Sequence, residues 1–196
     1  MFMQIIQGRV TDSDRFLAEA GRWPIDLKPG ATGYLGCTWG VASDGTGFVA
    51  ARFDSKEAAT RNSQRPEQAA WWQRMAPAFG DVSFHDCTDV DTMVGGGSNE
   101  ARFVQVIQGR AKDQAAARIM LRDSEGQLSE GRPDILGVVM AWHGDTGEFT
   151  QMVYFRSEQD ARAGEGSATD DEVDNQYRDM MAVEPTFIDL TDPRFD

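Results

Sequence analysis

The chain has 196 residues, 40% of them hydrophobic and 10% aromatic, which is enough apolar surface for one ordinary domain or two small ones. Its 32 acidic residues outnumber 19 basic ones, and the net charge of −13 excludes a nucleic-acid or anionic-membrane partner bound through charge. No stretch approaches the roughly 18 apolar residues of a membrane span, and the N-terminus lacks the features of a signal peptide. We therefore expect a cytoplasmic protein.

Few residues suit metal or cofactor chemistry. Cys37 and Cys87 fit a reducing compartment better than a disulfide framework, and the two histidines are too far apart in sequence for metal-ligand spacing. There is no P-loop, no dinucleotide-binding glycine motif after a strand and no nucleophile elbow. The sequence thus predicts neither a bound metal nor a cofactor, and leaves assembly into a homo-oligomer open.

The chain repeats itself. Phe2–Arg9, FMQIIQGR, returns as Phe103–Arg110, FVQVIQGR, with six of eight residues unchanged. Such self-similarity is typical of an internal duplication. A glycine-rich stretch without side chains to pack separates the copies and is typical of a flexible linker. We predict domains at 1–92 and 101–196, joined by a linker at 93–100.

Both copies show the same order of elements. In the first, the pattern predicts a strand at 2–10, a helix near 12–21, a hairpin of strands near 33–42 and 47–53, a helix interrupted at 62–66, and a strand near 81–87. In the second, the corresponding segments are 103–110, 112–122, 135–143 with 149–155, a helix interrupted at 164–167, and 185–190. Ser55 and Ser157 occupy positions typical of helix N-caps.

This order predicts the α+β class, with two tandem ferredoxin-like βαββαβ repeats. Each repeat would have an antiparallel sheet of strand order 4-1-3-2 with both helices on one face. The first strand is apolar on both sides, with Met3 and Ile5 pointing one way and Phe2 and Ile6 the other, so the second face also needs cover. We expect the two sheets to pack against each other as an intramolecular dimeric α+β barrel. Two separate domains would leave large apolar patches exposed.

One segment of the first copy resembles a known family. Phe53–Ala59, FDSKEAA, is followed by a helix break at 62–68 and by Trp71 and Trp72, and this succession resembles the antibiotic biosynthesis monooxygenase family. The whole chain is similar to a tandem copy of that domain. The resemblance implies a dimeric α+β barrel. It also implies chemistry of the family's kind, in which aromatic polyketides are oxidised without metal or flavin, while relatives degrade haem or isomerise muconolactones.

The helix break of the first copy is the candidate ligand site. Its polar and aromatic residues are Asn62, Arg65, Glu67, Trp71 and Trp72, with Trp39 approaching from the hairpin. Aromatic rings with a few polar groups suit a pocket for a planar organic molecule. The alternative is a surface ion pair between Arg65 and Glu67, with one tryptophan plugging the end of the barrel. Because the second copy has no matching set, we expect a single pocket.

Two further polar residues lie on predicted strands. Gln4, like Gln105 in the second copy, interrupts the centre of an apolar strand, and its amide needs a hydrogen-bond partner. The two amides could pair with each other, or each could anchor a ligand in its own cleft. His85, on the last strand of the first copy, is either a half-buried structural histidine or a general base.

These residues favour a protein that binds a small organic molecule. The more specific hypothesis is a cofactor-free oxygenase acting on a planar aromatic substrate, with His85 as the base that forms the substrate anion. The alternative is a non-catalytic binding or assembly module with the same barrel fold.

Overall fold

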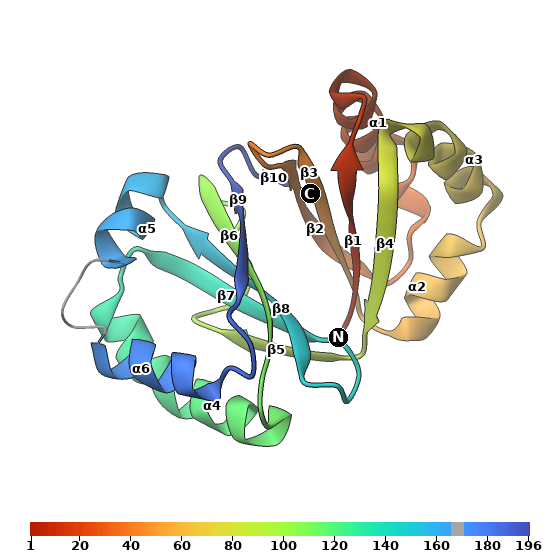
Figure 1. Ribbon diagram of the computed structural model, residues 1–196. Coiled ribbons are helices and arrows are strands. Elements are labelled where there is room, and N and C mark those ends of the chain that lie inside the picture. The colour runs from red at the N-terminus through yellow and green to blue at the C-terminus, as the bar shows by residue number, and fades with distance from the viewer. Residues whose placement is uncertain (166–170) are drawn as a thin grey trace. The chain divides into compact units, whose positions relative to one another are not determined.

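The computed structural model describes residues 1–165 and 171–196, and the chain divides into two compact units (Figure 1). The first unit consists of Met1–Thr88 and Arg194–Asp196, and the second of Asp89–Pro193. The described helices include none that is long and apolar enough to cross a membrane.

The first unit is an antiparallel sheet with helices on one face. Its strands are β1 (Phe2–Val10), β2 (Tyr34–Val41), β3 (Thr46–Phe53), β4 (Phe79–Cys87) and β10 (Arg194–Phe195), in the order β10-β2-β3-β1-β4. Its helices are α1 (Ser13–Asp26), α2 (Lys56–Ser63) and α3 (Pro66–Met75), with 3-10 turns η1 (Lys28–Gly30) and η2 (Ala76–Ala78). Without β10, this is the predicted ferredoxin-like order.

The second unit repeats the arrangement. Its strands are β5 (Asp89–Met93), β6 (Phe103–Arg110), β7 (Ile135–Trp142), β8 (Glu148–Phe155) and β9 (Thr186–Leu190), in the order β5-β7-β8-β6-β9. Its helices are α4 (Gln114–Gly131), α5 (Glu158–Glu165) and α6 (Asp171–Met180). The structure confirms the α+β class and the βαββαβ order of each unit. That the two sheets face one another stays a prediction.

Each sheet gains an edge strand that the sequence pattern does not indicate. The segment Asp89–Met93, which follows the first copy, pairs with β7, and Arg194–Phe195, which follows the second, pairs with β2. The outer N–H and C=O groups of β7 and β2 thereby find partners. The contact-defined units therefore differ from the predicted ranges at 89–92 and 194–196.

Helix starts follow the predicted caps. The Ser55 and Ser157 hydroxyls accept the backbone N–H groups of Ala58 and Asp160 at 3.2 and 3.1 Å. Such caps satisfy N–H groups that have no partner within the helix. The predicted helix break at 164–167 extends outside the described residues.

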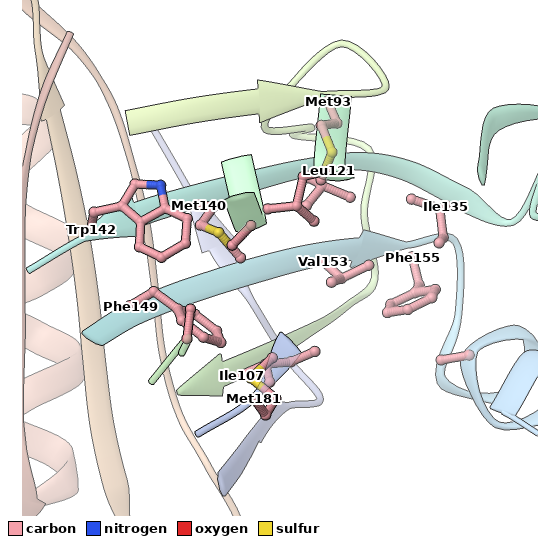
Figure 2. Close-up of a cluster of buried hydrophobic side chains, with 14 of the residues drawn as sticks. Met93, Ile107, Leu121, Ile135, Met140, Trp142, Phe149, Val153, Phe155 and Met181 are labelled. Atoms are coloured by element: carbon pink, nitrogen blue, oxygen red, sulfur yellow. The ribbon is translucent and has the colours of Figure 1, made fainter. Parts of the chain in front are cut away.

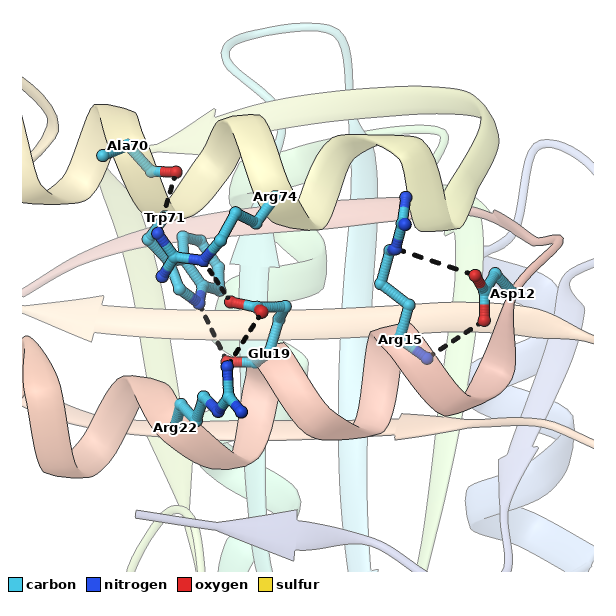
Figure 3. A network of polar contacts seen from close by, with 7 residues as sticks. All are labelled: Asp12, Arg15, Glu19, Arg22, Ala70, Trp71 and Arg74. Atoms are coloured by element: carbon cyan, nitrogen blue, oxygen red, sulfur yellow. Dashed lines mark hydrogen bonds and ion pairs between the residues drawn. The ribbon is translucent and has the colours of Figure 1, made fainter.

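Helices α1 and α3 are joined by a polar network around Glu19, which is 7% exposed (Figure 3). The Arg74 guanidinium lies 2.9 Å from the Glu19 carboxylate, and the Trp71 indole N–H donates to the Glu19 carbonyl oxygen at 2.8 Å. Pairing the buried carboxylate offsets its desolvation, and the indole bond fixes the orientation of Trp71.

The core of the second unit lies between its sheet and α4 (Figure 2). Its largest fully buried side chains include Trp142, Phe149 and Met140. The Asp91 carboxylate of β5 accepts from the Trp142 indole N–H at 2.9 Å and from Arg118 of α4 at 2.8 Å. These bonds hold the added edge strand against the helix.

Candidate functional site

The first unit has a small cavity, about 80 Å³, between its sheet and its helices. Its lining includes Gln4, Ile6, Trp39, Val49 and Ala51 from the strands and Ala20, Trp23, Asn62, Trp71 and Met75 from the helices. An apolar cavity of about 150 Å³ holds benzene, so this space is too small for a planar polycyclic molecule without rearrangement.

Aromatic side chains fill most of the space between this sheet and its helices. Trp39 packs edge-on against Phe16 with ring centroids 5.9 Å apart, and Trp23 packs on Tyr34 at 4.7 Å. Such ring pairs contribute beyond the area they bury. The tryptophans from which the sequence predicts a pocket therefore mainly fill the space between this sheet and its helices.

The predicted ligand-binding residues fall into two groups. Gln4, Trp39, Asn62 and Trp71 line the cavity together. The remaining residues, Arg65, Glu67 and Trp72, are outside its lining.

Arg65 links two segments of the first unit through hydrogen bonds. Its guanidinium donates to the Leu27 carbonyl at 2.9 Å and to the Asn62 side-chain oxygen at 3.0 Å. It lies 3.9 Å from the carboxylate of Glu67, whose side chain is 65% exposed. This matches the ion-pair alternative, with the added role of fixing Asn62. Trp72 packs instead on Phe79 and Phe84, with centroids 6.3 and 5.3 Å away.

Both histidines lie away from the helix-side cavities. His85 pairs with Ile5 across the sheet, whereas the alternate residues Gln4 and Ile6 line the cavity, so His85 lies on the opposite face. His143 contacts the Thr150 hydroxyl at 3.0 Å, and Thr150 lies on the opposite face from its neighbour Gln151, which faces the helices. In this arrangement neither His85 nor His143 is placed to act as a base for a ligand in the cavity of its unit.

Asp196 and Tyr34 both line the first cavity. The Tyr34 hydroxyl donates to the Asp196 carboxylate at 2.8 Å. Burial raises the pKa of the Tyr34 phenol and of the Cys37 thiol, and it also raises the pKa of Asp196. Cys37 and Cys87 are both free and buried. The cysteines are therefore neutral core residues at physiological pH, without the exposed thiolate that a nucleophile needs.

The second unit has a much larger cavity, about 950 Å³, in the corresponding position between sheet and helices. Most of its lining is aliphatic or methionine, including Met93, Ile107, Met120, Leu121, Leu128, Ile135, Val138, Val153 and Met181. This volume is at the upper end of the range for ligand pockets, about 300–1,000 Å³. This cavity lies outside the single pocket expected in the first copy, and where a ligand binds stays a prediction.

Equivalent positions on the first helix of each unit explain part of the difference in volume. Each helix begins after an aspartate, Asp12 or Asp113, whose carboxylate accepts the N–H three residues on at 3.0 Å. Counting from these caps aligns Trp23 with Ser124, and each lines the cavity of its own unit. A hydroxymethyl group thus replaces an indole.

The sheets show the same exchange of large for small. Tyr34 and Ile135 are equivalent because each pairs with the phenylalanine that ends the neighbouring strand, just before a bulge. By the same alignment, Trp39 of the first unit is equivalent to Met140 of the second. The second unit therefore lacks the rings that fill the first, and the volume they would occupy remains open.

Gln105, Gln151 and Tyr177 are among the polar side chains that line the larger cavity. The Tyr177 hydroxyl donates to the Gln151 side-chain oxygen at 2.8 Å, and Gln105 donates to Asp189 at 3.4 Å. Gln151 and Gln105 are 6% and 7% exposed. Gln4 likewise donates to Asp86 of its own sheet at 2.9 Å.

Sequence reasoning missed Gln151 and Tyr177. One signal was present, because Gln151 is a single amide within the otherwise apolar end of β8, FTQMVYF. No pattern marks Tyr177, whose position depends on how α6 packs. Among the described residues, no cluster of acidic, histidine and cysteine side chains is arranged to hold a metal ion.

Two of the arginines that line the larger cavity form ion pairs. Arg132 lies 2.9 Å from the Asp134 carboxylate, with side chains only 13% and 19% exposed. Arg162 pairs with Asp189 and with Glu158. Arg178 is exposed and also lines the cavity. The least exposed polar residues of the lining therefore comprise the ion-paired Arg132 and the neutral Gln105 and Gln151.

Solved structures with a similar fold include two candidate monooxygenases. A candidate monooxygenase from Fusobacterium nucleatum has a TM-score of 0.82 at 10% identity, over 100% of this chain and 93% of its own. One from Lactobacillus acidophilus has a TM-score of 0.75 at 13% identity, over 96% and 92%.

A Listeria monocytogenes ferredoxin-fold protein related to antibiotic biosynthesis monooxygenases has a TM-score of 0.54 at 10% identity, over 99% of this chain and 95% of its own. Neither the protein-family models nor the curated proteins compared with the chain gave a match. At these identities the likeness shows a fold, and that fold is the ferredoxin-like one of monooxygenase-like proteins, as the resemblance in the sequence predicts.

Proposed function

We propose that this protein binds a small, largely apolar organic molecule in the cavity of its second unit. The observation that carries this proposal is the open volume of about 950 Å³, walled by aliphatic side chains around a few convergent polar groups. A large apolar pocket with a few placed polar groups is the usual form of a small-molecule site. The first unit, with its space filled by aromatic rings, has a mainly structural role in this proposal.

The finer hypothesis is a cofactor-free oxygenase acting on a planar aromatic substrate. It is supported by the shared fold with candidate monooxygenases. Oxygenation without a cofactor needs a base that forms the substrate anion. The faces on which His85 and His143 lie favour binding without this chemistry over a histidine-assisted oxygenase.

Filling the second cavity tests the binding proposal. Ser124→Trp places in the second unit the residue that the first unit has at the equivalent position, Trp23. The matched control is Ile119→Trp, which adds the same residue to the same helix at a site 52% exposed. The probe is N-phenyl-1-naphthylamine, a neutral molecule whose fluorescence rises in apolar surroundings.

We expect the wild type and Ile119→Trp to bind the probe alike, and Ser124→Trp to bind it at least about tenfold more weakly because the indole takes its place. Circular dichroism would establish that both variants are folded. Equal binding by Ser124→Trp, or no binding by the wild type, would show that the second cavity is not the site.

Oxygen uptake tests the finer hypothesis separately. With anthrone, a planar aromatic ketone, as the probe substrate, uptake above the buffer rate by the wild type but not by Ser124→Trp would support an oxygenase. Unchanged buffer-level uptake would favour the binding function.

A further inference from the structure

Gln151 is a polar residue that its own unit does not explain. It lies on β8 between Ile107 and Met140 of the neighbouring strands, which are 9% and 0% exposed. Its side-chain oxygen accepts from Tyr177, while among the described residues no acceptor contacts its amide nitrogen. Gln151 is not among the described residues whose buried polar atoms lack a partner, so its amide nitrogen is open to the cavity that it lines.

The fold does not require an amide at this position. The register that pairs Gln151 with Ile107 pairs Val49 with Ile6 in the first unit. Valine therefore suits the same place on the same strand. At Gln151 the amide N–H group is instead available to a molecule in the cavity.

The remaining surroundings narrow the chemistry of that molecule. Arg132 and Arg162 already have carboxylate partners, and the third lining arginine, Arg178, is exposed. A charged group deep in the cavity would therefore be far from an available counter-charge and costly to bury. Beside three aromatic residues, the walls consist largely of aliphatic side chains and of flexible methionines such as Met93 and Met120. Aliphatic chains fit such walls better than planar aromatic ones.

We infer that the second cavity recognises an uncharged aliphatic molecule with a carbonyl group, such as a ketone, aldehyde or ester, whose oxygen accepts the Gln151 amide N–H. This inference rests on the proposed binding function and specifies its ligand class. Tyr177 holds the amide, because its hydroxyl occupies the Gln151 oxygen and directs the nitrogen toward the cavity.

Displacement of N-phenyl-1-naphthylamine measures the preference. The competitors are 2-octanone, its isostere 2-methyl-1-octene, which has CH₂ in place of the carbonyl oxygen, and octanoate. We expect the wild type to bind the ketone roughly tenfold more tightly than the alkene, the value of one hydrogen bond to a buried donor, and octanoate more weakly than the ketone.

Two variants remove the donor. Gln151→Val takes the residue of the first unit, and Gln151→Glu keeps the shape and the oxygen that Tyr177 needs but replaces the N–H group by an acceptor. In both, we expect the ketone and the alkene to bind within about twofold of each other. The matched control is Gln108→Val, the same change on the opposite face of the sheet, where Gln108 donates to Thr150 at 3.1 Å. It should keep the preference for the ketone.

A ketone preference that survives both Gln151 variants would overturn the inference, and so would tighter binding of octanoate than of 2-octanone. Either result leaves the binding proposal standing, provided that Ser124→Trp still abolishes probe binding. If Ser124→Trp binds the probe like the wild type, the binding proposal itself is refuted.

Discussion

Replacing Trp39 by methionine tests whether the aromatic residues of the first unit fill space or line a site. Methionine is the residue that the second unit has at this position, Met140. A tryptophan that faces an empty ligand site loses few protein contacts when it is truncated. One that fills the core loses nearly all of them.

The structure predicts a large loss of stability. Trp39 is only 9% exposed and packs edge-on against Phe16 at 5.9 Å. Truncating a buried tryptophan to alanine costs about 3–5 kcal/mol, and methionine retains part of the volume, so we expect about 2–3 kcal/mol. At about 24 cal/mol per Å³, each kilocalorie of cavity cost corresponds to roughly 40 Å³, half of the present 80 Å³ cavity.

Urea denaturation of the wild type and the variants measures this cost. The matched control is Trp72→Met, because Trp72 is less buried and packs in part against Phe84, which is 49% exposed. We expect the control to cost about 1 kcal/mol. A cost below 1 kcal/mol for Trp39→Met, or equal costs for the two variants, would refute the view that Trp39 fills the first unit.

Three further predictions concern single contacts. Arg74→Ala should lower the free energy of unfolding by about 1–3 kcal/mol in a denaturant titration, because it removes the nearest counter-charge of the buried Glu19 carboxylate; a loss under 0.5 kcal/mol would contradict this. Arg65→Ala should cost about 1–2 kcal/mol in the same assay, since its guanidinium bonds join two segments, and it should leave probe binding unchanged because it lies in the first unit. Neither Cys37 nor Cys87 should react with iodoacetamide in the folded protein, as mass spectrometry would show. Burial raises the pKa of Cys87 from 9.0 to about 12, so its contribution to stability is complete below about pH 9 and is lost as the pH rises toward 12.

Local patterns in the sequence determine the elements and their order in this protein. The octet at Phe2–Arg9 and its return at Phe103–Arg110 mark the first strand of each unit, and Ser55 and Ser157 mark helix starts. Each of these signals is a pattern of residues close in the chain, so it can be recognised without the tertiary structure. The edge strands at 89–93 and 194–195 are too short to show a period of their own.

Only the tertiary structure determines where the open cavity lies. A tryptophan gives the same sequence signal whether it lines a ligand site or fills the core. The sequence therefore indicates Trp39 and Trp71 as candidate ligand-binding residues and gives no indication of the role of Trp23. The volume left open depends on side chains from several elements that meet over one sheet face, such as Ser124 from α4 and Gln151 from β8. No local sequence pattern predicts the combined volume of these side chains, because close packing is a property of the assembled core.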